Sequence, residues 1–320
     1  MRRDGGRLRD WGLLLFCNLT WASQFALVKL VQDRVGPVFT TCAPMLVATA
    51  LLWPFVRVGQ RTRGGSSPVG RRDVAEFGLV GVLGQVAAQL LVTWGTVLSL
   101  ASNAALLQLA LPAVTALMAF LILGERMTLM RWIGFLLALA GVVQCSGVDW
   151  RELDLSSRRF LLGNLLVLGG VAGSSFYNVY SKRLLRRFHP LEVLLYSYYA
   201  VDVVLLPLAL TVEPDGPHRL LTAGAKAWTG LALLALLQYA LSMVVFLTVL
   251  TRLDATQAAL TNYLIPFFGV LLAWLLLGEV LTVPMLIGGA LVLASTLLVT
   301  VYEDRRAGKA PAPTVAEEEA

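Results

Sequence analysis

The chain has 320 residues, of which 57% are hydrophobic and 14% are charged, and its mean hydropathy is +0.73. Soluble domains carry roughly 25% charged residues, so this composition excludes a water-soluble globular protein and predicts a chain that lies in a bilayer. The formal net charge of +6 would suggest nucleic-acid binding in a soluble protein. Because the basic residues cluster between apolar runs, we interpret them as topology signals and expect no nucleic-acid partner.

Apolar stretches recur along the chain, and a membrane-spanning helix needs roughly 20 largely apolar residues. The first five helices are expected at Trp11–Leu30, Gly36–Val56, Val74–Val97, Ala101–Leu123 and Thr128–Val148. The second five are expected at Phe160–Ser181, Pro190–Leu210, Ala225–Leu250, Gln257–Leu277 and Leu281–Tyr302. The sequence therefore predicts an all-α integral membrane protein with ten transmembrane helices.

A long motif occurs twice: ASNAALLQLALPAVTALMAFLILGERMT from Ala101 and ATQAALTNYLIPFFGVLLAWLLLGEVLT from Ala255. An offset of about 154 positions pairs identical residues, namely Pro112 with Pro266, Gly124 with Gly278 and Glu125 with Glu279. Repetition at half the chain length indicates two copies of one unit. We therefore expect a cytoplasmic N-terminus (1–10), a first five-helix repeat (11–148), a second five-helix repeat (160–302) and a disordered cytoplasmic tail (303–320).

Lysine and arginine predict the orientation, because loops rich in these residues stay in the cytoplasm. With the N-terminus inside, the cytoplasmic segments hold 19 of the 26 Lys and Arg residues and the opposite side holds six, with Lys29 at a helix end. Both termini are therefore expected in the cytoplasm of a multi-pass cell-membrane protein. An odd number of helices per copy makes the two copies inverted repeats, whose interface near the midplane is the usual place for a substrate.

The repeated prolines predict an unusual feature in the fourth and ninth helices. A proline inside a helix removes the hydrogen bond to the carbonyl four residues earlier, which belongs to Gln108 before Pro112 and to Asn262 before Pro266. We interpret these four residues as candidates for a substrate cavity. The alternative is that each amide bonds a neighbouring helix or fills the gap that the proline leaves.

Further polar and aromatic residues recur at helical spacing. They lie on one face of the first, third, sixth and eighth helices: Asn18, Trp21, Phe25 and Lys29; Gln85 and Gln89; Tyr177 and Asn178; Tyr239 and Ser242. Polar groups in hydrocarbon are costly unless they find partners, so these faces should contact protein or line a water-filled cavity. Each residue alone fits a packing role, whereas together they predict a polar, aromatic-lined cavity.

Four charged residues need separate interpretation. Asp202 lies within the seventh apolar stretch, where it either couples transport to a proton, makes a structural hydrogen bond or extends towards the outer surface. Lys29 either attracts an anionic substrate group or extends to the lipid headgroups. Glu125 and Glu279 each follow a glycine at a helix end and precede a threonine that can cap the next helix, so we interpret both as structural junctions.

Motifs for catalysis are missing from the sequence. There is no G-x-x-x-x-G-K-[ST] phosphate loop, paired-carboxylate motif or nucleophile elbow. The three cysteines, Cys17, Cys42 and Cys145, lie in apolar stretches without metal-ligand spacing. We therefore expect no catalytic residues, no metal and no cofactor.

Several of these segments resemble the drug/metabolite transporter superfamily, specifically its EamA-type exporters. The motifs are NLTWASQFALVK in the first helix, ALLQLALPAVTALMAFLILGERMT with RWIGFLLALAGV, and AALTNYLIPFFGVLLAWLLLGEVLT with IGGALVLAS. SSFYNVYSKRLLRR at the sixth helix is a weaker match. Many relatives have an arginine in the second helix, where this chain has CAPMLVAT, so no role inferred from that arginine is transferred.

The resemblance implies a ten-helix secondary carrier with a central cavity lined mainly by helices 1, 3, 4, 6, 8 and 9. Such a carrier moves a small polar metabolite, amino acid or drug, usually outward, by alternating access, with a proton or a counter-substrate as a further partner. The alternatives are an importer or exchanger of the same superfamily and, in another class, a membrane enzyme or scaffold. The sequence does not decide whether the protein forms a homodimer.

Overall fold

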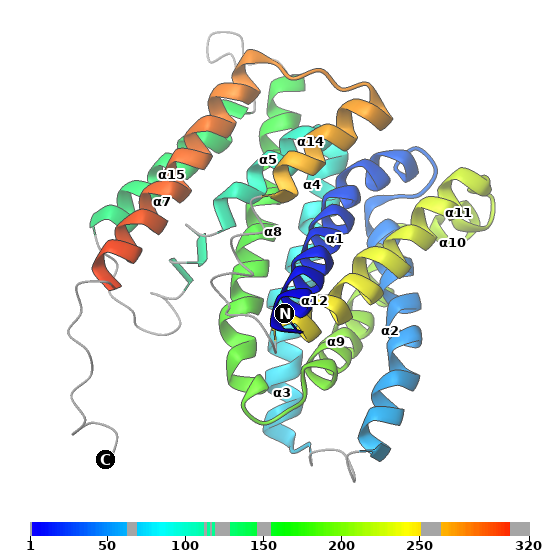
Figure 1. The fold of residues 1–320 in the computed structure, drawn as a ribbon. Coiled ribbons are helices and arrows are strands. Elements are labelled where there is room, and N and C mark those ends of the chain that lie inside the picture. The colour runs from blue at the N-terminus through cyan, green and yellow to red at the C-terminus, as the bar shows by residue number, and fades with distance from the viewer. Residues whose placement is uncertain are drawn as a thin grey trace, which may run out of the picture.

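Helices form the whole regular structure of the part of the chain that is described. The computed structural model (Figure 1) describes residues 2–62, 69–111, 114–115, 117–118, 129–145, 155–250 and 264–307. Within these ranges the regular elements are helices and no strand occurs. The expected all-α fold is thereby confirmed.

Most helix ends lie within a few residues of the predicted ones. In the first half the helices are α1 (Arg2–Val31), α2 (Pro37–Thr62), α3 (Arg71–Leu79), η1 (Val80–Leu91), α4 (Val92–Leu98), α5 (Ala101–Leu107), η2 (Gln108–Ala110) and α7 (Leu129–Cys145). In the second half they are α8 (Leu155–Leu185), α9 (Pro190–Val212), α10 (Gly216–Leu221), α11 (Gly224–Leu233), η3 (Leu234–Leu241), α12 (Ser242–Leu250), α14 (Leu264–Leu277) and α15 (Val283–Ala307). Helix α15 therefore extends beyond Tyr302 into the predicted tail.

Six helices among the described residues are long and apolar enough to cross a membrane. They are Gly12–Val31, Pro37–Thr62, Arg71–Leu98, Arg158–Leu185, Pro190–Val212 and Gly224–Phe246. Three shorter apolar helices are Trp132–Gly141, Leu264–Leu277 and Val283–Ser295. Parts of the expected fourth and ninth helices, and the tail beyond Ala307, lie outside the described residues.

Two of the long helices contain a wide turn at the same repeat position. The π-helical segment η1 begins at Val80 and η3 begins at Leu234, a separation that equals the sequence repeat of about 154 residues. Each π-segment is flanked by α-helix on both sides, so Arg71–Leu98 and Gly224–Leu250 are continuous helices with a changed register in the middle. Such π-helical segments are rare and are frequently found at functional sites.

Helices from the two halves pack in antiparallel pairs. At one end of the α2–α9 pair, the Glu213 carboxylate accepts hydrogen bonds from the backbone N–H groups of Val38 and Phe39, at 2.9 and 3.0 Å. At the other end, the Gln60 amide donates to Glu192 at 2.9 Å and to the Tyr196 hydroxyl at 3.0 Å. The last turn of each helix therefore contacts the first turn of its partner from the other half. Helices α7 and α15 also lie side by side (Figure 1).

Glycines allow α8 to pack closely against η1 and α4. A Cβ added at Gly173 would lie 2.6 Å from the backbone nitrogen of Ala88, and one at Gly163 would lie 2.9 Å from the carbonyl oxygen of Gly95. Small residues at helix contacts are how membrane helices bring their backbones together. This close packing joins the second half of the chain to the first near the π-segment η1.

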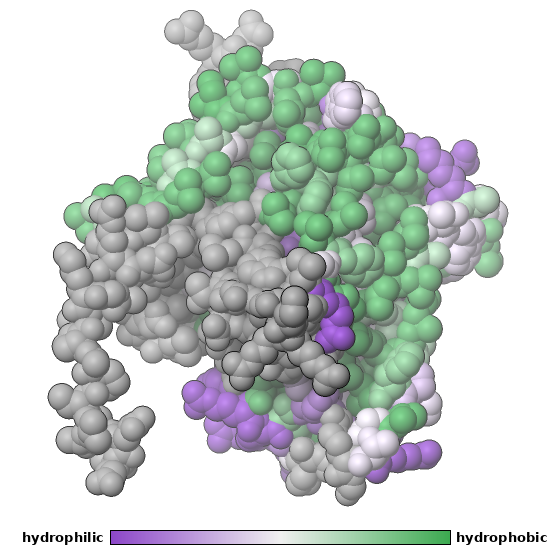
Figure 2. All heavy atoms as spheres, viewed as in Figure 1, coloured by the Kyte–Doolittle hydropathy of each residue, from purple (hydrophilic) through white to green (hydrophobic). Residues whose placement is uncertain are grey.

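Apolar side chains cover much of the outer surface. In Figure 2 hydrophobic residues dominate the visible face, and hydrophilic residues gather at its lower and upper right margins. Large apolar side chains on this exterior include Phe55, Val203 and Trp274, which are 68%, 73% and 59% exposed. A surface of this kind is stable only in hydrocarbon, which agrees with the membrane-length helices and shows a multi-pass membrane protein.

Candidate functional site

Four glutamines form a buried chain of hydrogen bonds between three helices. Gln238 of η3 donates from Nε2 to Oε1 of Gln24 in α1 at 2.7 Å, and Gln24 donates to Gln89 of η1 at 3.4 Å. Gln89 donates in turn to Gln85 at 3.4 Å. We call these residues the glutamine chain. It joins the two π-segments, one from each half of the protein, through α1.

A tryptophan and a serine extend this polar region along α1 and α12. The indole Nε1–H of Trp21 donates to Oγ of Ser242 at 2.9 Å, and that hydroxyl donates to the backbone carbonyl of Gln238 at 2.6 Å. The Trp21 ring also packs edge-to-face on Phe246, with centroids 4.9 Å apart. Helix α1 and the helix formed by η3 and α12 thus meet through an aromatic pair beside hydrogen-bonded polar groups.

Two buried side-chain amide oxygens of this region have no hydrogen-bond partner in the structure. They are Oδ1 of Asn18, whose residue is 1% exposed, and Oε1 of Gln238, whose residue is 6% exposed. The Asn18 amide nitrogen donates to the carbonyl of Leu14 at 2.9 Å, so the side chain is held in place while its oxygen is free. A buried acceptor without a donor costs about 1–3 kcal/mol. Both oxygens therefore favour a bound molecule that supplies N–H or O–H groups.

The tyrosines expected at the site, Tyr177 of α8 and Tyr239 of η3, lie next to members of the glutamine chain. The side chain of Tyr177 packs on Gly84, which precedes Gln85 in η1. The carbonyl of Tyr239 accepts a hydrogen bond from the Tyr198 hydroxyl at 3.1 Å. Asn178, the neighbour of Tyr177, is exposed and is not part of the glutamine chain. The structure thus brings Tyr177 and Tyr239 to the buried polar region and places Asn178 on the outside of α8.

The proline positions are only partly described. Pro112 and Asn262 lie outside the described residues, whereas Pro266 is buried near the start of α14. The expectation of a free carbonyl at Gln108 is wrong, because the chain tightens into the 3₁₀ turn η2 and the Leu111 N–H donates to that carbonyl. The Gln108 side chain is half-buried and does not belong to the glutamine chain.

Phe25 serves packing rather than polar contact in this structure. It is 2% exposed and joins a cluster of small and apolar side chains from α4, α5, α8 and α14. We call this cluster the apolar plug; its buried members are Phe25, Val92, Ala101, Ala104, Ala105, Leu107, Val167 and Ala273. Phe25 and Gln24 are consecutive residues of α1, so the plug and the glutamine chain both contact this turn of the helix.

Glu279 makes a contact that its sequence position did not predict. The backbone N–H groups of Ala101 and Ser102 donate to its two carboxylate oxygens at 3.0 Å each, and the Ser102 hydroxyl donates at 2.6 Å. The expected helix end is confirmed, because α14 stops at Leu277 and Gly278 has a φ of +68°. The carboxylate, however, caps α5 of the other half, which has no capping side chain at Leu100.

The two charged candidates lie away from the glutamine chain. The Lys29 ammonium donates to the carbonyl of Val97 at 3.4 Å, near the end of α4. Asp202 is half-buried in α9, and its Oδ1 has no hydrogen-bond partner in the structure. Neither residue contributes a charge within hydrogen-bonding distance of the four glutamines. The polar region of the described residues is therefore built from neutral groups.

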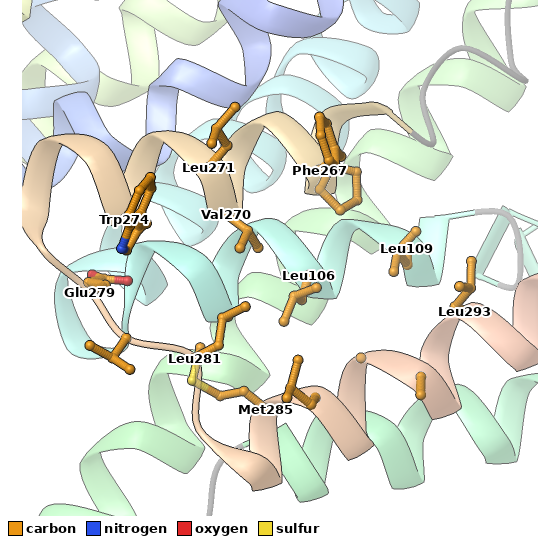
Figure 3. A pocket seen from close by; sticks show the side chains of 15 residues that line it. Leu106, Leu109, Phe267, Val270, Leu271, Trp274, Glu279, Leu281, Met285 and Leu293 are labelled. Atoms are coloured by element: carbon orange, nitrogen blue, oxygen red, sulfur yellow. The ribbon is translucent and has the colours of Figure 1, made fainter.

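A separate apolar groove of about 750 Å³ opens on the outer surface between α5, α14 and α15. Figure 3 shows its walls, which include Leu106, Leu109, Phe267, Trp274 and Met285, with Glu279 at one end. Phe267 and Trp274 are 64% and 59% exposed, so the groove faces outward from the bundle. It is not the central cavity that the polar residues predicted. In a bilayer this surface faces the hydrocarbon.

Sequence reasoning missed two members of the chain, Gln24 and Gln238. Gln24 lies off the face of the first helix that carries Asn18, Trp21 and Phe25 under a 3.6-residue period. Gln238 lies inside η3, where the π-helical hydrogen bonds span one residue more than in an α-helix and change the register. The scarcity of polar residues in these apolar stretches was the signal that could have found them.

The described residues contain no group of three His, Cys, Asp or Glu side chains placed to hold a metal ion. The cysteines Cys17 and Cys42 are buried and free, and Cys17 donates a weak hydrogen bond from its thiol to the carbonyl of Ser242 at 3.4 Å. These two cysteines are therefore core residues of the helix contacts.

Comparisons with known proteins agree with this architecture. The model of the EamA-like transporter family matches residues 11–146 and again residues 161–301. A probable terminal-alkyne amino-acid exporter of Streptantibioticus cattleyicolor is 31% identical over 90% of this chain and 92% of its own. An uncharacterized transporter of Archaeoglobus fulgidus is 27% identical over 91% and 97%. One crystal structure that is 19% identical aligns with a TM-score of 0.61 over 92% of this chain and 96% of that one, which shows a shared fold.

The two family matches coincide with the two halves that the sequence repeat defines, and together they cover most of the chain. The two named relatives are both described as transporters, one of them as a probable exporter. The protein is therefore a membrane transporter that belongs to the EamA-like transporter family.

Proposed function

We propose that the protein is a secondary active exporter of a small polar metabolite such as an amino acid, working by alternating access. In this proposal the chain has ten transmembrane helices in two inverted five-helix repeats, with both termini in the cytoplasm. The separation of η1 and η3 by one repeat length supports the two repeats. The antiparallel packing of α2 with α9 supports their inverted arrangement. Outward transport is supported by the relative in Streptantibioticus cattleyicolor, whose name describes a probable amino-acid exporter.

The observation that carries the proposal is the glutamine chain. It connects α1, η1 and η3 by side-chain amides. Amides are costly in a protein interior unless they are hydrogen-bonded, and polar residues inside membrane helices commonly mark functional sites. The unpartnered oxygens of Asn18 and Gln238 lie in the same region and can accept hydrogen bonds from an ammonium or amide group. We propose that this region, with Trp21, Tyr177 and Ser242, binds the substrate.

The test is uptake and efflux in proteoliposomes with purified protein. A panel of neutral, acidic and basic amino acids is offered with and without a pH gradient, and the orientation of the protein is established by protease access to the tail. The expected result is saturable flux of neutral, polar or zwitterionic substrates that depends on Gln238. Equal flux through empty liposomes, or through liposomes that hold the heat-denatured protein, would contradict a transport function.

The other directions and classes predict different results from the same assay. An importer would move substrate from the outside against a gradient, and an exchanger would need a counter-substrate inside the vesicles. A membrane enzyme would convert the substrate without moving it, and a scaffold would do neither. Chemical analysis of both compartments therefore distinguishes all four from the exporter.

A further inference from the structure

We propose that Glu279 is the latch of an extracellular gate, which holds α5 and α14 together over the apolar plug. The inference rests on the proposed alternating access, because only then must these two helices separate during each cycle. The predicted topology places the loop after α14 and the start of α5 on the extracellular side. The latch therefore closes the outer route to the glutamine chain.

The contact joins the two halves with three hydrogen bonds to one carboxylate. Two come from the backbone N–H groups of Ala101 and Ser102, at 3.0 Å each, and the third comes from the Ser102 hydroxyl at 2.6 Å. Hydrogen bonds to an ionised carboxylate are stronger than those between neutral groups, and the positive end of the helix dipole adds to them. The contact is also reversible, because the N–H groups and the carboxylate can both be solvated by water when the helices separate.

The plug explains why separating these helices would open a route. Ala101, Ala104, Ala105 and Ala273 are fully buried where α5 crosses α14. A Cβ added at Gly269 of α14 would overlap Ala105 of α5, so the two backbones are in close contact. Phe25 of α1 packs beside this crossing, with its ring 3.4 Å from a Cβ added at Gly269. A solute of the size of an amino acid cannot pass between these helices until they separate.

A second carboxylate provides a matched control. Glu213 caps α2 with two backbone hydrogen bonds of 2.9 and 3.0 Å, which is the same chemistry as that of Glu279. The α2–α9 pair is also fixed at its opposite end by Gln60, and its contact residues belong to a large core that does not include the plug. Loss of the Glu213 cap should therefore leave the plug closed.

The experiment measures access to a cysteine placed in the plug. Cys17, Cys42 and Cys145 are replaced by alanine, and Ala104→Cys is introduced into this background. A membrane-impermeant maleimide is then applied from the outside to right-side-out vesicles. We expect slow labelling of the parent, a rise of about tenfold with Glu279→Ala, and a smaller rise with Glu279→Gln or Ser102→Ala, which leave part of the contact. About tenfold corresponds to about 1.4 kcal/mol in the opening equilibrium.

Two controls separate gate opening from unfolding. Glu213→Gln in the same background should label at the parent rate. A second background that keeps only native Cys42, which is 1% exposed in the α2–α9 core, should stay unlabelled with Glu279→Ala if the protein remains folded. Labelling of Cys42 would show that the alanine variant unfolds, and the comparison then passes to Glu279→Gln and Ser102→Ala.

Three results would overturn the latch. These are unchanged labelling of the thiol introduced by Ala104→Cys in the folded Glu279 variants, an equal rise with Glu213→Gln, and labelling from the cytoplasmic face alone. The readout needs no transported substrate. Increased labelling without flux in proteoliposomes would retain the gate and contradict the transport function, whereas flux with unchanged labelling would contradict the latch alone.

Discussion

Gln24 and Gln238 face each other across the two halves of the protein, with Nε2 of Gln238 2.7 Å from Oε1 of Gln24. This is a side-chain bond between α1 and η3, and it connects through Gln89 to η1. Both residues are buried, at 5% and 6% exposure. Removing one amide therefore leaves the other without its partner in a region that excludes water.

We expect Gln24→Leu and Gln238→Leu each to lower substrate flux at least tenfold. Each variant leaves one buried amide unpaired, which costs about 1–3 kcal/mol, and removes a group that we propose binds substrate. The double variant should lose less stability than the sum of the single ones, because both single variants remove the same Gln24–Gln238 hydrogen bond. Flux in proteoliposomes and thermal unfolding in detergent measure both effects. Gln144→Leu, on the exposed surface of α7, is the control; an equal loss there would contradict a specific role of the chain.

Replacing Gly173 by alanine should destabilise the contact between α8 and η1. The new Cβ would lie 2.6 Å from the backbone nitrogen of Ala88, and backbone cannot move aside as a flexible side chain can. We expect a loss of about 1–3 kcal/mol in the free energy of unfolding. Gly78→Ala in α3 is the control, since nothing lies within 4 Å of its added Cβ and alanine favours the helix by about 0.5–1 kcal/mol. Similar melting temperatures for the two variants would refute the close packing.

Arg187 should stabilise the end of the bundle where α3 meets the turn between α8 and α9. Its guanidinium contacts Asp73 at 2.7 Å and Glu76 at 3.0 Å, and both carboxylates are largely buried. Arg187→Gln leaves these carboxylates without that cation, so we expect a loss of about 1–3 kcal/mol. The exposed neighbour Arg186 supplies the control, because Arg186→Gln should change stability by less than about 0.5 kcal/mol. Chemical denaturation of both variants in detergent decides the matter.

Asp202 is the proposed proton-coupling carboxylate. Its Oδ1 is buried without a hydrogen-bond partner, and a carboxyl group can accept a proton there that an amide in its place cannot. We expect Asp202→Asn to abolish the response of flux to a pH gradient while leaving substrate-driven exchange in place. Thr49→Val, which removes a buried hydroxyl from α2 but no titratable group, should change the pH response less. Flux that still follows the pH gradient in Asp202→Asn would assign the residue a structural role.

Composition was enough to predict an all-helical fold and the positions of the long apolar helices that the structure describes. The seventh helix was expected at Pro190–Leu210 and is found at Pro190–Val212, because His189 and Pro190 start it and the apolar stretch sets its length. Hydrophobic length identifies a helix in hydrocarbon, since every backbone group must be satisfied within the segment. The ends of this helix depend on such local residues, and its predicted ends therefore lie close to the observed ends.

The partners of the polar residues could not be predicted from local sequence. Glu279 was assigned to the turn around Gly278, yet its carboxylate bonds to Ser102, which lies in the other half of the chain. The place of Gln238 in the glutamine chain depends on the π-helical register of η3. Both depend on how the halves pack, which the local sequence pattern does not specify. Of the predicted stripe residues, Asn18 and Ser242 are buried and Trp21 donates to Ser242, because polar groups in an apolar helix are costly unless they face protein.

The exchange of helix caps between halves has a consequence for how the protein is assembled. Glu213 completes the start of α2, Gln60 contacts the start of α9, and Glu279 completes the start of α5. Each half therefore supplies side chains that bond the helix ends of the other half. A gene cut between Cys145 and Leu155 should give two fragments that are degraded when made singly and that survive, as a non-covalent complex, when made together.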